Sequence, residues 1–275
     1  MFRTSVFFDI AQEKCQHSLF LKDPRSAWDF HGPVLTRFRQ TVPHGGFEHL
    51  RRVCESKASH YVCTSNVDGQ FEKSGFHRTR IFNAHGFVHF WQCTHMACTK
   101  GKEPWPAGDL TPGSLPKCKY CGRDARPNAS FFDDNQGEYP ESLNGRMIEA
   151  QFEGFEKWLK QLKNAQLCIL EIGCGESEHS LRLIPKPRGK WACMSDEWGM
   201  APIASSLVRI DPKVPVPGEE QGAIGADTEL PNFAHIQTGA QEALRLLAEV
   251  LNCREGTPKA KQAAPPQRKK LVRRR

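Results

Sequence analysis

The chain has 275 residues, of which 39% are hydrophobic and 25% are charged, enough for one substantial core or for a main domain with a smaller one inserted. No apolar run is long enough to span a bilayer, so we expect no membrane partner. The opening "MFRTSVFFDIAQEKCQ" has one basic residue, Arg3, before a short apolar run broken by Asp9, which predicts no secretory signal.

The formal net charge of +7 belongs to the C-terminal end of the chain. Residues 254–275 hold nine Lys or Arg and one Glu, a net of +8, which leaves about −1 for the rest. Proline, alanine and like charges bury little surface and repel one another, which predicts a disordered basic tail. This tail is then either a solvated segment without a specific partner or the one place where the sequence allows a nucleic acid or a nuclear import factor to bind.

The first third of the chain contains helical patterns followed by a strand. Residues 27–40 and 47–57 carry apolar side chains at helical spacing, and Pro33 must start, end or kink its helix. A short apolar run at 60–65 precedes a stretch with loop composition. Residues 86–93, "GFVHFWQC", alternate like a strand that leads into a cysteine-rich region.

The second half alternates helices with apolar strands. An amphipathic helix is expected over 142–162, with one apolar side made of Met147, Ile148, Phe152, Phe155 and Leu159. The runs 167–173 and 205–211 predict buried parallel strands. A final helix is expected over 238–251, with Thr238 and Gln241 in a capping-box pattern.

This order predicts an α/β fold, a Rossmann-like parallel sheet with helices on both faces plus a small inserted zinc-ribbon module. We expect the Rossmann-like domain to comprise residues 1–92 and 131–253. The module then covers 93–130, and the tail covers 254–275.

Four of the eleven cysteines are spaced like metal ligands. Cys118 and Cys121 are separated by two residues, and Gly122 follows them; Cys93 and Cys98 enclose His95, a competing ligand. The remaining cysteines are scattered, which favours a reducing compartment, and hence an intracellular location in the cytoplasm or the nucleus, over a disulfide scaffold. We predict a closed structural zinc site, with free buried thiols as the alternative.

A glycine-rich stretch suggests a different family when it is considered alone. "ILEIGCGESEHSLRL" (169–183) resembles the first motif of class I methyltransferases, where a glycine turn after a strand approaches a nucleotide. That motif opens its domain, whereas here it stands late in the chain and Ser177 replaces the third glycine. We therefore interpret it as a later strand of a fold that began upstream.

Several short motifs stand in a fixed order along the chain: "TSNVDG" (64–69), "HG" (85–86), the two cysteine pairs, "CGRDARPNASFF" (121–132), "EIGCG" (171–175), "RIDP" (209–212) and "GAQEALRLL" (239–247). Their order and spacing over about residues 24–252 resemble the sirtuin family of NAD-dependent protein deacylases. The resemblance implies transfer of an acyl group from lysine to the ADP-ribose of NAD, with release of nicotinamide. It also implies an acyl-lysine protein or peptide as substrate, bound as a strand between the domains.

The resemblance implies roles for particular residues. His85 falls at the position of the family's catalytic base, and an imidazole suits the activation of a ribose hydroxyl near neutral pH. A histidine beside a strand is more often packed than catalytic, and Asn and Asp are ordinary turn residues, so these roles depend on the order of the motifs. The remaining implied residues are Ser65, Asn66, Asp68, Gly173, Gly175 and Asp211 for the cofactor and Ser130 and Phe132 for the acyl-lysine tunnel.

The sequence departs from the family pattern at several positions. It contains no Gly-Ala-Gly-x-Ser phosphate loop, and its first residues resemble the segment just downstream of that loop. Asp133 stands where a Gly follows the Phe pair, and Glu176 stands where a small hydroxyl residue is usual. Two hypotheses follow: a deacylase of weak activity, or a catalytically degenerate module that binds zinc and an acylated peptide.

Overall fold

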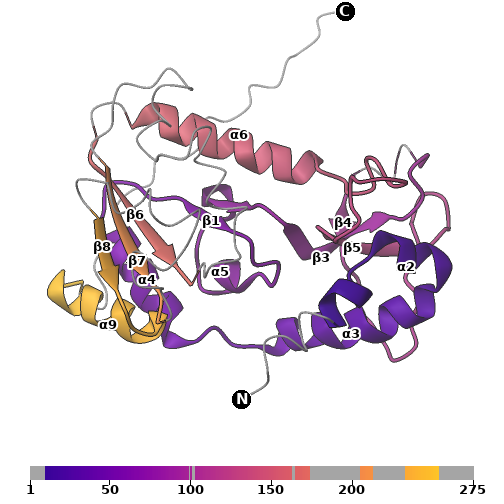
Figure 1. The fold of residues 1–275 in the computed structure, drawn as a ribbon, viewed down its shortest axis with the longest axis horizontal. Helices are drawn as coiled ribbons and strands as arrows, with labels where there is room; N and C mark the ends of the chain where they lie inside the picture. The colour runs from indigo at the N-terminus through magenta and orange to yellow at the C-terminus, as the bar shows by residue number, and fades with distance from the viewer. Residues whose placement is uncertain are drawn as a thin grey trace, which may run out of the picture.

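The computed structural model describes residues 10–98, 100, 103–162, 165–173, 205–212 and 233–253. Gly175, Glu176 and the tail over 254–275 lie outside these residues. The described part contains three small sheets, two of them parallel and one antiparallel (Figure 1). No helix within these ranges has the length and apolar character needed to cross a bilayer.

The parallel strands confirm the α/β class. β6 (Leu167–Ile172) pairs with β7 (Ser205–Ile210), and β7 pairs with β8 (Phe233–Ile236), all in parallel. β1 (Val62–Thr64) and β2 (Ile81–Asn83) form a second parallel pair. The parallel strands expected over 167–173 and 205–211 are thus confirmed, but the burial expected for β6 is not, because only Glu171 is buried in it. The three other parallel strands were not predicted.

Helices cover these strands on both faces, because each helix buries an apolar stripe. α4 (Gly45–Glu55) and α9 (Ala240–Val250) contribute to one core, in which Leu50 and Leu244 lie with Ile210 of β7. α6 (Arg146–Gln161) contributes Phe155, Trp158 and Leu159 to another core, against Tyr61, Cys63 and Leu167. The Rossmann-like arrangement expected from the sequence is therefore present.

Two helices begin at other residues than the sequence patterns predict. α6 begins at Arg146 and not at 142, because the Asn144 side chain accepts from the Arg146 amide and the Ser142 hydroxyl donates to Asp134. The capping box at Thr238 is wrong: Gly239 occupies the N-cap of α9, without a side-chain cap.

The segment before β1 forms a pair of helices, α2 (His17–Lys22) and α3 (Pro24–Gln40). Asp23 caps α3 by accepting from the Ser26 amide at 3.0 Å, and Pro24 stands in the first turn, where it is tolerated. The sequence predicted that Pro33 starts, ends or kinks a helix. Pro33 lies inside α3, so it neither starts nor ends this helix. Two short helical turns, α5 (Gln70–Lys73) and a 3₁₀ turn (Arg78–Arg80), follow β1.

The antiparallel sheet joins β4 (Trp105–Pro106), β3 (Gly86–Cys93) and β5 (Ala125–Ala129), in that order. β3 was predicted, but its burial does not alternate, because its register against β5 shifts between Phe87 and Trp91. Three residues of β3 therefore leave β5 as a bulge. β3 crosses the domain boundary expected at residue 92, and it pairs with β5 at both of its ends. The division of the chain into domains at residues 92 and 130 therefore stays a prediction.

α2 and α3 pack on this sheet (Figure 1, right). The Trp28 indole donates to the carbonyl of Ala125 at 3.1 Å, and the ring of Phe20 stacks on Phe131 with centroids 5.6 Å apart. The N-terminal helices and the cysteine module thus share one apolar core, which also contains Cys93, Cys98 and Cys118.

Two histidines are buried in this region and make stability depend on pH. Burial lowers the pKa of His17 and of His31 to about 4, and the nearby Arg126 guanidinium also lowers both. Asp133 and Asp134 act in the opposite direction on His17. A histidine has a pKa of about 6.5 in the unfolded chain, so below that pH protons favour the unfolded state.

We therefore expect the free energy of unfolding to fall as the pH drops from about 6.5 to about 4, because the folded state resists protonation of both imidazoles. The loss at about pH 5 is about 2 kcal/mol for each histidine. Urea unfolding at about pH 7.5 and about pH 5 measures it, and His31→Phe should flatten the profile, whereas the exposed His77→Ala should not. Equal free energies of unfolding at the two pH values would contradict the lowered pKa values of His17 and His31.

Candidate functional site

The four cysteines expected to bind metal lie together. Their Sγ atoms all fall within 4.8 Å of one another, and those of Cys93 and Cys121 are 3.5 Å apart. A tetrahedral zinc with bonds of about 2.3 Å needs sulfur atoms roughly 3.8 Å apart, so the cluster suits that ion. His95 contacts Cys93 only through its backbone amide, and its ring lies near Arg123.

Local backbone bonds shape this cluster. The Cys118 amide donates to the Arg123 carbonyl at 2.7 Å, and the Gly122 amide donates back to the Cys118 carbonyl at 2.9 Å. Gly122 has φ +73°, a left-handed conformation that costs a glycine little. The nine cysteines described by the structure are free, so no disulfide among them withholds a member of the cluster from a metal ion.

His85 lies between β2 and β3, at the carboxyl end of a parallel strand. Its carbonyl accepts from the amide of Ser130 at 2.8 Å, so the candidate base and a candidate substrate residue are adjacent. Gly86 has φ +82°, and a Cβ there would stand 2.4 Å from the carbonyl oxygen of Asn128. Only glycine lets β3 approach β5 this closely beside His85.

The loop of Ser65, Asn66 and Asp68 is tied to the same place. The Ala84 amide donates to the Thr64 carbonyl at 2.8 Å, and the bulge of β3 contacts the loop that follows Thr64. In that bulge the Val88 amide donates to the Val67 carbonyl at 3.2 Å, and His89 Nε2 lies 2.9 Å from the Asp68 carbonyl. The irregularity of β3 thus fixes this loop next to His85.

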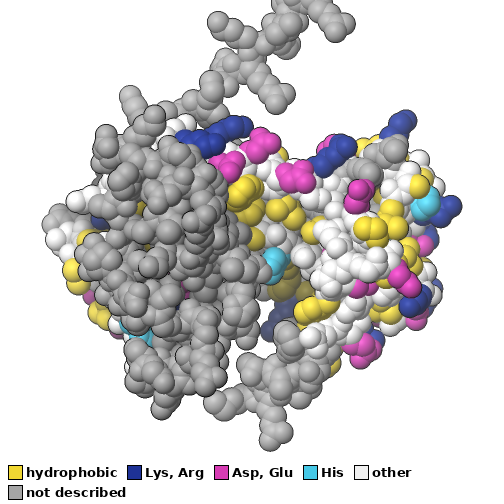
Figure 2. Space-filling view, turned by 45° about the horizontal axis from the view of Figure 1, so that its top comes forward, with side chains coloured by type: hydrophobic (Ala, Val, Ile, Leu, Met, Phe, Trp, Pro, Cys, Tyr) yellow, Lys and Arg dark blue, Asp and Glu magenta, His cyan; other side chains and the backbone are white. Residues whose placement is uncertain are grey.

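The side chains of this group reach solvent to different extents. Asn66 and Ser130 are exposed and His85 is half-buried. Asp68 Oδ1 accepts from the Gln70 amide at 3.0 Å, which leaves its other oxygen for a further partner. The space-filling view shows a hollow in the middle of the molecule, where hydrophobic side chains and a histidine are visible (Figure 2).

Gly173 and Asp211 form a second group, at the carboxyl ends of β6 and β7. The Gly173 amide donates to the Ile210 carbonyl at 3.0 Å, and the Asp211 amide donates to the Ile236 carbonyl at 3.3 Å. The structure brings these two residues together, and it brings Ser65, Asn66, Asp68, His85 and Ser130 together. Gly175 lies outside the described residues.

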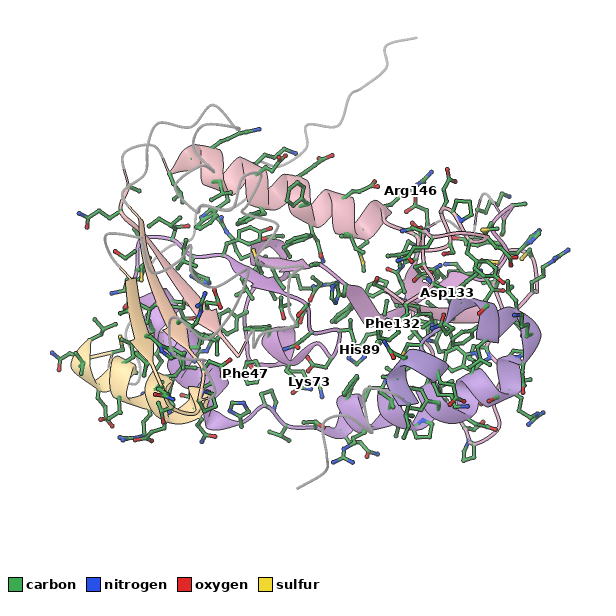
Figure 3. All side chains as sticks on the ribbon, viewed as in Figure 1. Phe47, Lys73, His89, Phe132, Asp133 and Arg146 are labelled. Carbon is green, nitrogen blue, oxygen red and sulfur yellow. The ribbon has the colours of Figure 1, made fainter. Side chains whose placement is uncertain are left out.

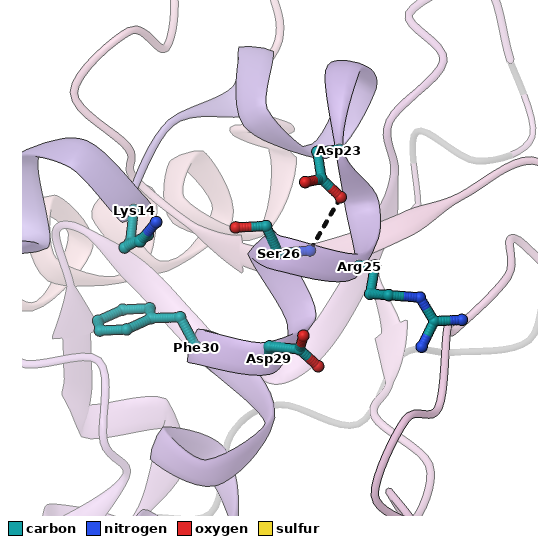
Figure 4. Close-up of a pocket in the computed structure, with 6 residues that line it drawn as sticks. All are labelled: Lys14, Asp23, Arg25, Ser26, Asp29 and Phe30. Atoms are coloured by element: carbon teal, nitrogen blue, oxygen red, sulfur yellow. Dashed lines mark hydrogen bonds between the residues drawn. The ribbon is translucent and has the colours of Figure 1, made fainter.

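A pocket of about 450 Å³ lies elsewhere, at the N-terminal part of α3 (Figure 4). It is lined by Lys14, Asp23, Arg25, Ser26, Asp29 and Phe30. None of the residues expected at the site is among them, and Asp23 and Ser26 already bond each other as the cap of α3. We therefore assign the chemistry to the residues around His85 and not to this pocket.

The sequence patterns missed two buried charge clusters near these residues. Arg209 of β7 donates to both carboxylate oxygens of Glu171 in β6, at 2.8 and 3.1 Å, and both side chains are buried. Arg126 of β5 donates to Asp134 at 2.9 Å, and the neighbouring Asp133 bonds α2. A charged residue inside an apolar strand is the signal that could have revealed Glu171.

Comparisons with known proteins agree with this arrangement. A family model described as Sir2 family matches residues 4–152, which is more than half of the chain. An NAD-dependent protein deacylase of Aquifex aeolicus is 24% identical over 124 residues, 45% of this chain and 49% of that protein. One of Aeropyrum pernix is 29% identical over 116 residues, 42% of this chain and 44% of that protein. The chain thus spans about half the length of the curated relatives it matches.

Solved structures show the same fold. A Sir2 homologue in complex with NAD superposes with a TM-score of 0.57 at 17% identity, over 88% of this chain and 77% of that chain. Sir2 bound to acetylated peptide gives 0.56 at 16% identity, over 86% of this chain and 82% of that chain. With the family model matching more than half of its length, and with its parallel strands and four-cysteine cluster, the chain belongs to the Sir2 family.

Proposed function

We propose that this chain is an NAD-dependent protein-lysine deacylase that transfers the acyl group to ADP-ribose. The observation that carries the proposal is the set of backbone bonds that hold His85 beside Ser130 and beside the loop of Asn66 and Asp68. Family membership supports it, as do relatives named NAD-dependent protein deacylase and Sir2 structures with NAD or an acetylated peptide.

The residues around the strand ends suit a dinucleotide. Such ligands bind outside the carboxyl ends of parallel strands, where β1, β6 and β7 present Asn66, Gly173 and Asp211. Gly173 has φ +61°, and a Cβ placed there would meet none of the described residues within 4 Å, so among these residues nothing blocks a ligand from its backbone. Asp68 and Ser65 lie at the end of the neighbouring parallel pair.

Bound NAD would supply a ribose carbon that exchanges nicotinamide for the acyl oxygen of the substrate. His85 would accept a proton from a ribose hydroxyl at an imidazole nitrogen. Asn66 would orient the ribose or a water molecule, and Asp68 would accept from a carboxamide. Ser130 and Phe132 would hold the acyl-lysine chain away from bulk water.

The test is nicotinamide release by the purified protein in the presence of NAD and an acetyl-lysine peptide. Release that requires both reactants supports the deacylase. Folded, zinc-loaded protein that releases none, but binds the peptide, would leave the chain as a peptide-binding module and overturn the proposal.

Replacement of His85 by Ala should reduce steady-state nicotinamide release at least about a hundredfold, because completion of each turnover after nicotinamide has left needs the proton acceptor. Its zinc content should stay at one equivalent, because four cysteines already complete the cluster. His95→Ala is the matched control, and it should keep both zinc and activity. Loss of zinc from the His85 variant would show that His85 is a metal ligand and contradict its role as base.

A location in the cytoplasm or the nucleus remains part of the proposal. The free state of the described cysteines fits a reducing compartment. Contact of the basic tail with nucleic acid or an import factor rests on its sequence alone.

A further inference from the structure

The loop that follows β5 carries two adjacent aspartates that fasten it from two sides. Asp134 is buried and holds the inner side: it accepts from Arg126 at 2.9 Å, from the Phe131 amide at 2.7 Å and from the Ser142 hydroxyl at 2.7 Å. The Phe131 ring lies under the Arg126 guanidinium at 4.5 Å. The inner side of the loop is therefore a fixed base.

Asp133 holds the outer side of the loop to a segment more than a hundred residues away in sequence. Its Oδ1 accepts from the amide of His17 at 2.5 Å, and its Oδ2 accepts from the amide of Ser18 at 2.9 Å. Both donors belong to the first turn of α2, whose amides have no partner within the helix. Burial raises the pKa of this carboxyl, but the bonds from Ser18 and His17 together hold the pKa below its ordinary value.

Phe132 directly precedes these two aspartates in the chain. Its amide donates to the Cys15 carbonyl at 3.0 Å, so backbone and side-chain bonds join residues 15–18 to residues 132–133. The Phe132 side chain is 43% exposed, although its neighbour Phe131 is buried. Figure 3 labels Phe132 and Asp133 on this loop, and the two candidate substrate residues, Ser130 and Phe132, both stand on it.

An exposed aromatic ring binds a ligand more tightly when its backbone is already fixed, because a mobile loop loses conformational entropy on binding and this reduces the affinity. The inner anchor at Asp134 and the bond from Ser130 to His85 fix one end of the loop. The outer end is held by one backbone bond, from Phe132 to Cys15, and by the two amide bonds from α2 that the Asp133 carboxylate accepts, so Asp133 supplies most of this attachment.

We propose that Asp133 is a positioning residue for the acyl-lysine substrate: by fastening the loop to α2 it holds Phe132 in place for the bound peptide. This inference rests on the proposed function. It also makes α2 part of the substrate site, although no residue of α2 was expected there from the sequence.

The experiment compares wild type with Asp133→Asn and Asp133→Gly. The Asn variant keeps the shape but presents an NH₂ group to one of the two donors, and the Gly variant removes the anchor. Three quantities are measured: KM and kcat of nicotinamide release, the Kd of a fluorescent acetyl-lysine peptide, and amide hydrogen exchange over residues 15–20 and 130–134. The fully exposed Asp109→Asn is the matched control.

We expect KM and Kd to rise about tenfold in both variants while kcat changes less than about twofold, because two charge-assisted bonds are lost far from the reacting atoms. Exchange should become faster in both segments together. Unchanged peptide affinity in the variants, with or without faster exchange, overturns the positioning role. A wild type that binds the peptide but releases no nicotinamide instead overturns the proposed function and leaves the binding comparison to decide on Asp133.

Discussion

Replacement of Cys118 by Ser is expected to remove the metal and to destabilise the protein by about 5 kcal/mol or more, since structural zinc sites contribute directly to folding. Cys118 is 2% exposed, and its backbone bonds to Gly122 and Arg123 shape the turn that presents Cys121. A hydroxyl is a poor substitute for a thiolate ligand, so the remaining three cysteines would hold zinc weakly. Zinc determination by mass spectrometry and thermal unfolding measure the two effects.

Cys54→Ser is the matched control for this prediction. Cys54 is half-buried and lies outside the four-cysteine cluster, and burial raises the pKa of its thiol to about 12, so it stays protonated. We expect this variant to retain one equivalent of zinc and most of its stability. A Cys118 variant that also retains one equivalent would show that the cluster is not the metal site.

Replacement of Gly86 by Ala is expected to cost about 3–5 kcal/mol of stability, because two penalties add at one position. The backbone has φ +82°, which disfavours any Cβ, and that Cβ would stand 2.4 Å from the Asn128 carbonyl oxygen. Relief of the clash must separate β3 from β5, and this displaces the bond between Ser130 and His85. Urea unfolding gives the loss of stability, and nicotinamide release should fall with it.

Gly113→Ala separates the two penalties. Gly113 has φ +78°, but a Cβ there would meet no atom of the described part of the chain within 4 Å. This variant should therefore show only the conformational cost, about 1 kcal/mol. If Gly86→Ala were no more destabilising than Gly113→Ala, the close approach of the two strands would be refuted.

Sequence patterns predicted the longer elements well, because these bury a continuous apolar side. The strand at 167–173 is an apolar run interrupted by Glu171, the strand at 205–211 carries Leu207, Val208 and Ile210 around Arg209, and α6 has a regular apolar stripe. β1 and β2 escaped prediction because each has only three residues, too few to show a period. The alternation expected in β3 failed because a bulge depends on what the partner strand does, and that information is not local.

The candidate site was predictable as a set of residues but not as a geometry. The cysteine spacing alone predicted the metal cluster, since four ligands must converge on one ion. The order of the motifs pointed to His85, whereas the backbone bonds that join it to Ser130 and to the loop of Asn66 depend on tertiary contacts. The partnership of Asp133 with α2 spans more than a hundred residues, and no local pattern contains it.

The pairing of β3 with β5 also has a consequence for the order of events during folding. One end of this pairing, Cys93 with Ala125, lies at the metal cluster, and the other end, Gly86 with Ala129, lies beside His85. A metal ion that joined Cys93 to Cys121 before the strands pair would close the long chain segment between them, and this would lower the entropic cost of their meeting. We expect pairing to proceed from the cysteines toward His85, so that the candidate base reaches its place only after the metal has been bound.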